Sequence, residues 1–273
     1  MITWKLKTWG RAGVAAAALS LAACGGEGGE AGKGGEGGEA GEAGVRGGEA
    51  GEGAAPAARA AGEGGEAGEA GAASAYAGLS GDQLTALRIQ HLHGFVMAAA
   101  AVNAENMPAE AAVLVQQGLL EVYDVAPDQF GDLNVAIVRA AADGNLNRAQ
   151  MMQRIRSAEA EIGRALGELE FDHAVLVVRM VDIATGLYQG VVQEDFVDPI
   201  EYQHSMGAAY AARASLHQDS MLQRNIGAYL EAQGELNRFV DLWPQATAPQ
   251  RPASYSQVLA QASRVRLALS PFL

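Results

Sequence analysis

Residues 151–169 read MMQRIRSAEAEIGRALGEL, and this stretch decides the fold class of the 273-residue chain. Its apolar residues recur at intervals of three and four, the spacing of one face of an α-helix. They are Met151, Ile155, Ala158, Ile162, Ala165 and Leu169. Helical spacing continues through most of residues 76–273, and no stretch alternates convincingly as a β-strand. We therefore predict an all-α bundle of seven or eight helices.

Capping residues and prolines mark several helix ends. Ser80–Gln83 and Asp198–Glu201 have the capping-box pattern, in which the first and fourth side chains bind backbone amides. Pro108 and Pro199 suit the first residue of a helix. With the apolar spacing, these signals predict helices over about residues 80–102, 108–123, 133–141, 151–169 and 172–193, one opening at Asp198, and two over about 222–240 and 254–269.

Residues 25–74 consist almost only of glycine, glutamate and alanine. Glycine loses much backbone entropy when ordered, and alanine buries too little apolar surface to compensate. We predict that residues 24–75 form a disordered acidic tether and residues 76–273 a single helical domain. The tether is interpreted as a spacer. A calcium-buffering or partner-binding tail is less favoured, because glutamates separated by glycine form no defined coordination cage.

Charge and residue usage exclude several function classes. The chain has a net charge of −13, which disfavours binding to nucleic acid. Residues 76–273 contain no lysine, so this segment cannot supply a Schiff-base lysine or a P-loop lysine. With one cysteine in the whole chain, neither an intramolecular disulfide nor a cysteine-based zinc site can form.

The first 24 residues have the pattern of a secretory signal. Basic residues precede an apolar run at residues 14–21 that is too short to span a membrane. The run leads into Leu21-Ala22-Ala23-Cys24, which contains the only cysteine. This tetrapeptide resembles the lipobox of bacterial lipoproteins.

The resemblance implies that residues 1–23 are a signal peptide and that Cys24 becomes the lipid-modified first residue of the mature chain. Several acyl chains, such as palmitate, give stable anchoring. Gly25 after the cysteine implies the outer membrane, with the helical domain in the periplasm. We expect the membrane and an envelope protein as partners, and we leave the oligomeric state open.

Two Glu-x-x-His sequences suggest a metal site. They are Glu170–His173 and Glu201–His204. In ferritin-like bundles, two such pairs and two further glutamates hold two irons. Candidates for the further glutamates are Glu105, Glu110 and Glu121. The alternative is that Glu201 serves only as a capping residue of its helix.

A second metal hypothesis uses histidine and methionine. His93 with Met97, and His217 with Met221, are each four residues apart on expected helices. Imidazole and thioether ligands suit Cu(I), although methionine at helical spacing also fills cores. Iron or copper is therefore the cofactor that the sequence allows.

A short pattern occurs twice. Residues 90–94 and 203–207 share Gln-His-x-x-Gly, ending at Gly94 and Gly207. A glycine within a helix usually permits close helix packing. The repeat reflects either two helical halves that pack alike or chance. His91 falls in an apolar stripe and is interpreted as a core histidine.

Residues 182–206 resemble the helical periplasmic segments that accompany bacterial oxidase-dependent iron permeases and imelysin-type uptake proteins. The residues that carry this resemblance are Asp182, Tyr188, Gly190-Val191, Asp198, Glu201-Tyr202 and Met206. The resemblance implies a role in metal uptake.

No Gly-x-Ser-x-Gly elbow, His-Glu-x-x-His helix or dinucleotide-binding loop occurs, so the sequence does not favour an enzyme. We predict a lipid-anchored envelope protein whose helical domain is a non-catalytic binding or scaffolding module. The alternative is a metal-handling lipoprotein, which needs the two Glu-x-x-His pairs to converge within about 5 Å in one pocket. A hydrolase would need serine or histidine beside a carboxylate in a cleft.

Overall fold

The structure is a computed structural model that describes residues 72–193, 196–218 and 222–273. The expected signal peptide, Cys24 and the expected tether up to residue 71 lie outside the described residues, and so does Met221.

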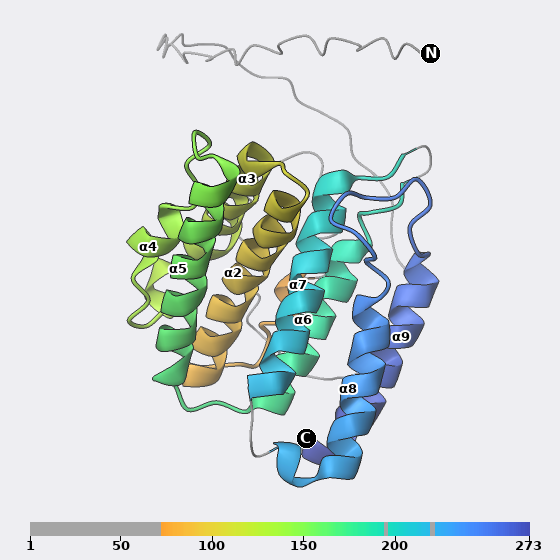
Figure 1. The fold of residues 1–273 in the computed structure, drawn as a ribbon. Helices are drawn as coiled ribbons and strands as arrows, with labels where there is room; N and C mark the ends of the chain where they lie inside the picture. Colours follow the sequence, from red (N-terminus) through yellow and green to blue (C-terminus); the bar gives the residue numbers. More distant parts are fainter. Residues whose placement is uncertain (1–71, 194–195, 219–221) are drawn as a thin grey trace, which may run out of the picture. The chain divides into compact units, whose positions relative to one another are not determined.

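Eight α-helices, α2 to α9, make up most of the described residues (Figure 1). In chain order they are α2 (Gly81–Ala104), α3 (Pro108–Gly118), α4 (Val135–Arg139), α5 (Arg148–Gly167), α6 (His173–Tyr188), α7 (Pro199–Gln218), α8 (Ile226–Val240) and α9 (Tyr255–Leu269). Across the same residues, strand pairing is limited to an isolated bridge between Val192 and Val197. The all-α prediction is confirmed.

The helices α2, α6 and α7 pack together at the centre of the bundle. On one side, α3 and α5 pack against α2, and α4 packs against α5. On the other side, α8 packs on α7, and α9 packs on α6 and α8 (Figure 1). One continuous cluster of buried apolar residues joins the two sides.

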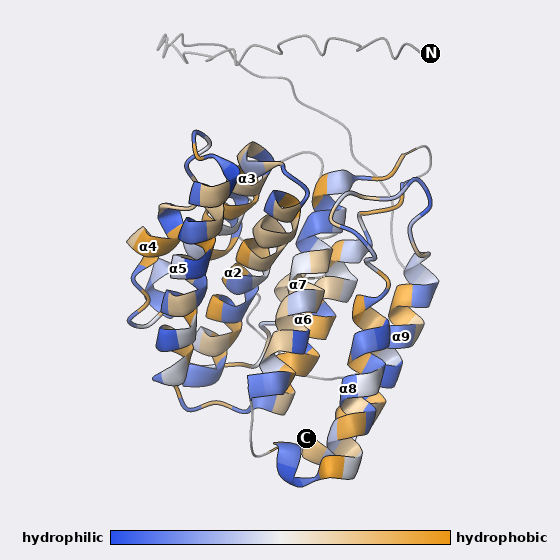
Figure 2. Ribbon diagram, in the orientation of Figure 1, coloured by the Kyte–Doolittle hydropathy of each residue, from blue (hydrophilic) through white to orange (hydrophobic). Residues whose placement is uncertain are grey.

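The apolar stripe of residues 151–169 is the buried face of α5. Met151, Ile155, Ala158 and Ile162 are fully buried, whereas Leu169 lies beyond the helix and is only partly buried. Figure 2 shows the corresponding alternation of hydrophilic and hydrophobic bands along α5 and α8. Burial of this one face is what orients α5 against α2.

The helix starts are only partly as expected. Ser254 and Gln257 form a reciprocal capping box at α9, and the Asp198 carboxylate accepts from the amide of Ile200 at 2.9 Å. The capping box predicted at Ser80 is wrong, because the Ser80 side chain makes no capping bond. The Gln83 side chain instead binds both backbone groups of Asp172, at 2.7 and 3.2 Å.

The helix predicted over residues 108–123 changes its geometry at Gly118. There α3 ends, and residues Leu119–Tyr123 form a π-helix closed by a 2.8 Å bond from the amide of Asp124 to the carbonyl of Leu119. The ring of Phe95 presses against Gly118, where an added Cβ would lie 2.6 Å from its Cγ. A contact from α2 therefore accompanies the wider turn, which local sequence does not encode.

The folded part extends into the expected tether. Ala72 and Ala75, which lie within the expected tether, are buried in the core. Tyr76 follows with its ring 4.3 Å from the Arg88 guanidinium and its hydroxyl 2.5 Å from Nδ1 of His91. Composition alone does not predict the burial of these two residues, because alanine fits both a tether and a tightly packed core.

Candidate functional site

The two copies of the Gln-His-x-x-Gly pattern, residues 90–94 on α2 and 203–207 on α7, contact each other where these helices cross. A Cβ on Gly207 would lie 2.2 Å from the carbonyl oxygen of Gly94, so the two backbones touch. Gln90 donates to the carbonyl of Ala211 at 2.8 Å, which shows that the two helices run antiparallel. A side chain at Gly207 would force the two helices apart, and one at Gly94 would make a tight contact at 3.0 Å from the backbone of Gly207.

Three buried histidines surround this crossing. The rings of His91 and His204 both contact Phe95, with centroid separations of 5.6 and 4.6 Å. Nε2 of His204 is 3.1 Å from the Gln117 side-chain oxygen, and Nδ1 of His93 is 3.4 Å from that of Gln90. The expected core role of His91 agrees with its burial, although its Nε2 has no hydrogen-bond partner.

Burial keeps these histidines neutral. Desolvation lowers the pKa of His91 to about 3, with smaller lowering contributions from the neighbouring His204 and from the positive charge of Arg88. It also lowers the pKa of His93 and of His204 to about 4. Nδ1 of His204 lies 3.8 Å from a Glu121 oxygen, but a neutral imidazole forms no ion pair there at pH 7.

The structure does not bring the two Glu-x-x-His pairs together. The amide of Glu170 binds the carboxylate of Asp82 at the start of α2, and the His173 ring stacks on Phe171 at 4.4 Å. His204 instead packs on Phe95, thirteen residues further along α2. At 1.5 Å per residue, this is a rise of about 20 Å. The pairs therefore occupy different levels of the bundle.

The additional glutamates do not complete a metal set. The Glu105 carboxylate binds the amide of Ala246 at 2.9 Å and the hydroxyl of Thr247 at 2.6 Å. Glu110 is exposed in the first turn of α3, and Glu121 has a carboxylate oxygen 3.8 Å from Nδ1 of His204. Within residues 72–193, 196–218 and 222–273, no group of three or more His, Cys, Asp or Glu side chains is placed to hold a metal ion.

The histidines of the copper hypothesis are also apart. His93 lies beside the glycine crossing on α2, with Met97 one turn later. His217 lies ten residues beyond Gly207, about 15 Å along α7, where its Nδ1 is 3.1 Å from the Tyr229 hydroxyl. The two histidines therefore do not share one site.

Three of the residues that resemble uptake proteins, Asp182, Tyr188 and Tyr202, make hydrogen bonds within the second half of the bundle. Asp182 binds the guanidinium of Arg266, with Nε at 2.9 Å. The Tyr188 and Tyr202 hydroxyls donate to the carbonyls of Ala253 and Gln245, at 2.7 and 3.0 Å. In this structure these side chains stabilise packing around α9 and the loop before it.

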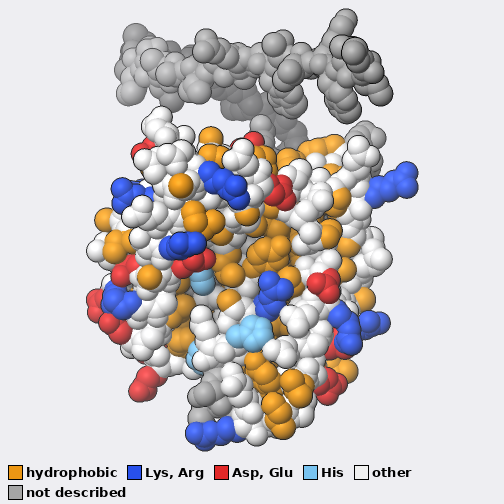
Figure 3. Space-filling model, viewed as in Figure 1, with side chains coloured by type: hydrophobic (Ala, Val, Ile, Leu, Met, Phe, Trp, Pro, Cys, Tyr) orange, Lys and Arg blue, Asp and Glu red, His pale blue; other side chains and the backbone are white. Residues whose placement is uncertain are grey.

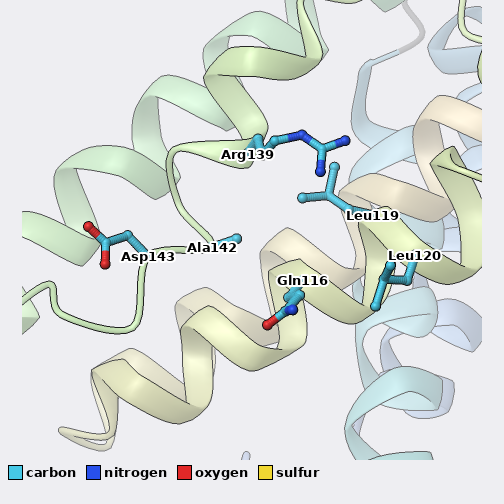
Figure 4. Close-up of a pocket in the computed structure, with 6 residues that line it drawn as sticks. All are labelled: Gln116, Leu119, Leu120, Arg139, Ala142 and Asp143. Atoms are coloured by element: carbon cyan, nitrogen blue, oxygen red, sulfur yellow. The ribbon is translucent and has the colours of Figure 1, made fainter. Parts of the chain in front are cut away.

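An open cleft of about 320 Å³ lies between the π-helix and the end of α4 (Figure 4). Three apolar and three polar residues line it: Leu119, Leu120, Ala142, Gln116, Arg139 and Asp143. The sequence did not single out these residues, because neither the π-helix nor the approach of α4 leaves a local pattern. The only signal available was Gly118, a glycine inside an otherwise helical stretch.

Comparison of the chain with protein-family models, with curated proteins and with solved structures finds no match. Among the described residues, none of the helices is both long enough and apolar enough to cross a membrane.

Proposed function

We propose that this chain is a lipid-anchored protein of the bacterial cell envelope and that its helical domain is a non-catalytic binding or scaffolding module. Support for the anchor comes from the sequence Leu21-Ala22-Ala23-Cys24, with Gly25 favouring the outer membrane and a periplasmic domain. Support for binding comes from the cleft beside the π-helix, which is the observation that carries this proposal.

Exposed apolar side chains extend the surface around the cleft. Leu120 is 55% exposed, and Val113, seven residues earlier on α3, is 50% exposed. A separate group of hydrophobic side chains, alanine included, lies at the middle of the face shown in Figure 3, over α2, α5 and α7. Apolar surface that remains accessible beside a concave site is typical of a binding surface.

The anchor is tested by growing a bacterial host that expresses the full chain with an alkyne-bearing fatty acid. We expect the protein to become labelled and to sediment with membranes. The matched variant Cys24→Ala should lose both the label and the sedimentation. Labelling that persists in Cys24→Ala, or a soluble unlabelled wild-type chain, would contradict the anchor.

The binding role is tested by photo-crosslinking in cells, with a benzophenone amino acid in place of Leu120. We expect a discrete adduct, detected by intact mass, that disappears when Ala142→Trp fills the cleft. The control places the same probe at Leu267, an exposed leucine on α9. Equal adducts at both positions, or an adduct that Ala142→Trp does not change, would contradict a role for the cleft.

A further inference from the structure

The cleft has two walls, and each carries both apolar and polar groups, with Gln116 at the end of α3 on the same side as the π-helix. The π-helix supplies Leu119 and Leu120, consecutive residues of which the first is 2% exposed and the second 55%. The opposite wall comes from the end of α4 and the residues after it, Arg139, Ala142 and Asp143. Figure 4 shows the Arg139 side chain extending beside Leu119. A ligand in the cleft would therefore meet an aliphatic surface and a guanidinium together.

The guanidinium of Arg139 is the charged group of the cleft that can bind an anionic ligand. Its Nη2 lies 3.3 Å from Asp124, and the two side chains are 52% and 40% exposed. An exposed pair of this kind is weak, and the guanidinium carries five N–H donors in a planar fork. A second carboxylate can therefore bind the fork without removing Asp124.

The carboxylate of Asp143, the acidic residue of the cleft, already accepts hydrogen bonds from within the protein. Oδ1 of Asp143 accepts from both the backbone amide and the side-chain amide of Asn145, each at 2.9 Å. Figure 4 shows its carboxylate pointing away from Leu119 and Leu120. Asp143 is thus poorly placed to attract a cation into the cleft, whereas Arg139 is well placed to attract an anion.

We propose that the cleft binds a carboxylate borne on a short aliphatic group, with Arg139 holding the carboxylate and Leu119 and Leu120 contacting the aliphatic part. The volume is at the lower end of the range for small-molecule sites, which suits a small ligand of this kind. This inference rests on the proposed binding function and names its ligand class. A free alkanoate and the carboxyl terminus of a peptide ending in leucine share this chemistry.

The proposal is tested on the full chain by titration, followed through the methyl NMR signals of Leu119 and Leu120. The probes are hexanoate and N-acetyl-leucine, compared with hexan-1-ol and N-acetyl-leucinamide, which lack the carboxylate. We expect at least one carboxylate to bind tenfold or more tightly than its neutral counterpart. Binding by only one of the two assigns the source as a free alkanoate or as a peptide terminus.

Matched variants separate the guanidinium fork from general charge. Arg139→Gln should abolish the preference for the carboxylate, and Arg139→Lys should reduce it. Arg154→Gln should preserve it, although the charge of Arg154 reaches Asp143. Equal loss in Arg139→Gln and Arg154→Gln, or no preference in the wild type, would overturn the proposal. If the crosslink at position 120 still forms in that case, the binding function stands and only the ligand class is wrong.

Discussion

The crossing of α2 with α7 and the edge formed by the π-helix and α4 use polar residues in opposite ways. At the crossing, His91 and His204 are buried and held neutral by desolvation. At the edge, Arg139 and Asp124 remain about half exposed and charged around an open cleft. Of the residues that first suggested chemistry, His93 and His204 belong to the core, whereas the concave surface is built from residues of no distinctive pattern.

Glycine shows the same contrast. Gly94 and Gly207 allow two backbones to touch, whereas a Cβ added to Gly227 or Gly234 of α8 would meet nothing within 4 Å. The absence of a side chain therefore permits the close crossing, whereas in α8 glycine only lowers the helix propensity.

The largest change in the free energy of unfolding should come from lowering the pH. Acid acts on the buried histidines at the crossing and not on the groups around the cleft. In the unfolded chain the histidines titrate near pH 6.5, whereas folding lowers the pKa of His91 to about 3 and those of His93 and His204 to about 4. Between pH 6.5 and 4 the unfolded state therefore binds more protons than the folded state. The free energy of unfolding consequently falls as the pH is lowered through this range. Each histidine contributes up to about 1.4 kcal/mol per pH unit. Urea midpoints measured by circular dichroism at pH 7.5, 6.5, 5.5 and 4.5 should fall steadily.

A flat midpoint over this range would show that these histidines are not held neutral by the fold. In His204→Gln one fewer histidine takes up a proton on unfolding. The free energy of unfolding should therefore fall less steeply, by up to about 1.4 kcal/mol per pH unit. The Asp143, Glu161 and Glu235 carboxyls have pKa values below their ordinary ones, so their contribution to acid lability is confined to pH values below about 4.5.

The next largest effect is expected from adding one methyl group at the crossing. Gly207→Ala would place its Cβ 2.2 Å from the Gly94 oxygen, so α2 and α7 must separate. Overpacking of this kind should reduce the free energy of unfolding by about 3 kcal/mol. Gly94→Ala should have a smaller effect, because its nearest backbone contact is 3.0 Å. Denaturant titration gives both values, and unchanged stability in Gly207→Ala would mean that the backbones do not touch.

The same substitution on the solvent side of α8 should have the opposite sign. In Gly234→Ala the new methyl group meets open space, and alanine has the higher helix propensity. We expect the variant to be more stable by about 1 kcal/mol. The same denaturant titration measures it, and destabilisation would indicate a surface already covered by another chain.

The smallest change in stability is expected at the cleft. Arg139→Gln removes an exposed ion pair with Asp124, so the free energy of unfolding should change by less than about 1 kcal/mol. Thermal melts of Arg139→Gln and Arg154→Gln should nearly coincide with that of the wild type. A loss of several kcal/mol in Arg139→Gln alone would assign Arg139 to folding.

Sequence predicts well what depends on neighbouring residues. The stripe on α5 and the helix predicted over about residues 254–269 require only local spacing, and both are present. The failures involve partners far along the chain. Gln83 binds Asp172 across 89 residues, and Phe95 of α2 presses on Gly118 at the start of the π-helix. Local periodicity contains no information about such contacts.

The candidate site was predictable only in part for the same reason. Glu-x-x-His spacing places two side chains on one helix face only where both residues are helical, as Glu201 and His204 are on α7, whereas Glu170 lies before the start of α6. The spacing also does not tell which helices lie at the same level. His173 and His204 are therefore similar in sequence context and distant in the bundle. The glycine pattern was more informative, because close backbone approach requires a partner, and the partner is the second copy of the pattern.

The attachment of Tyr76 has a mechanical consequence. Its hydroxyl meets His91 and its ring faces Arg88, immediately after the buried Ala72 and Ala75. Tension applied to the chain before residue 72 is therefore transmitted to α2 through a side chain that packs against the core. A pull on the N-terminal segment would have to break this contact before it could peel the first helix from the bundle.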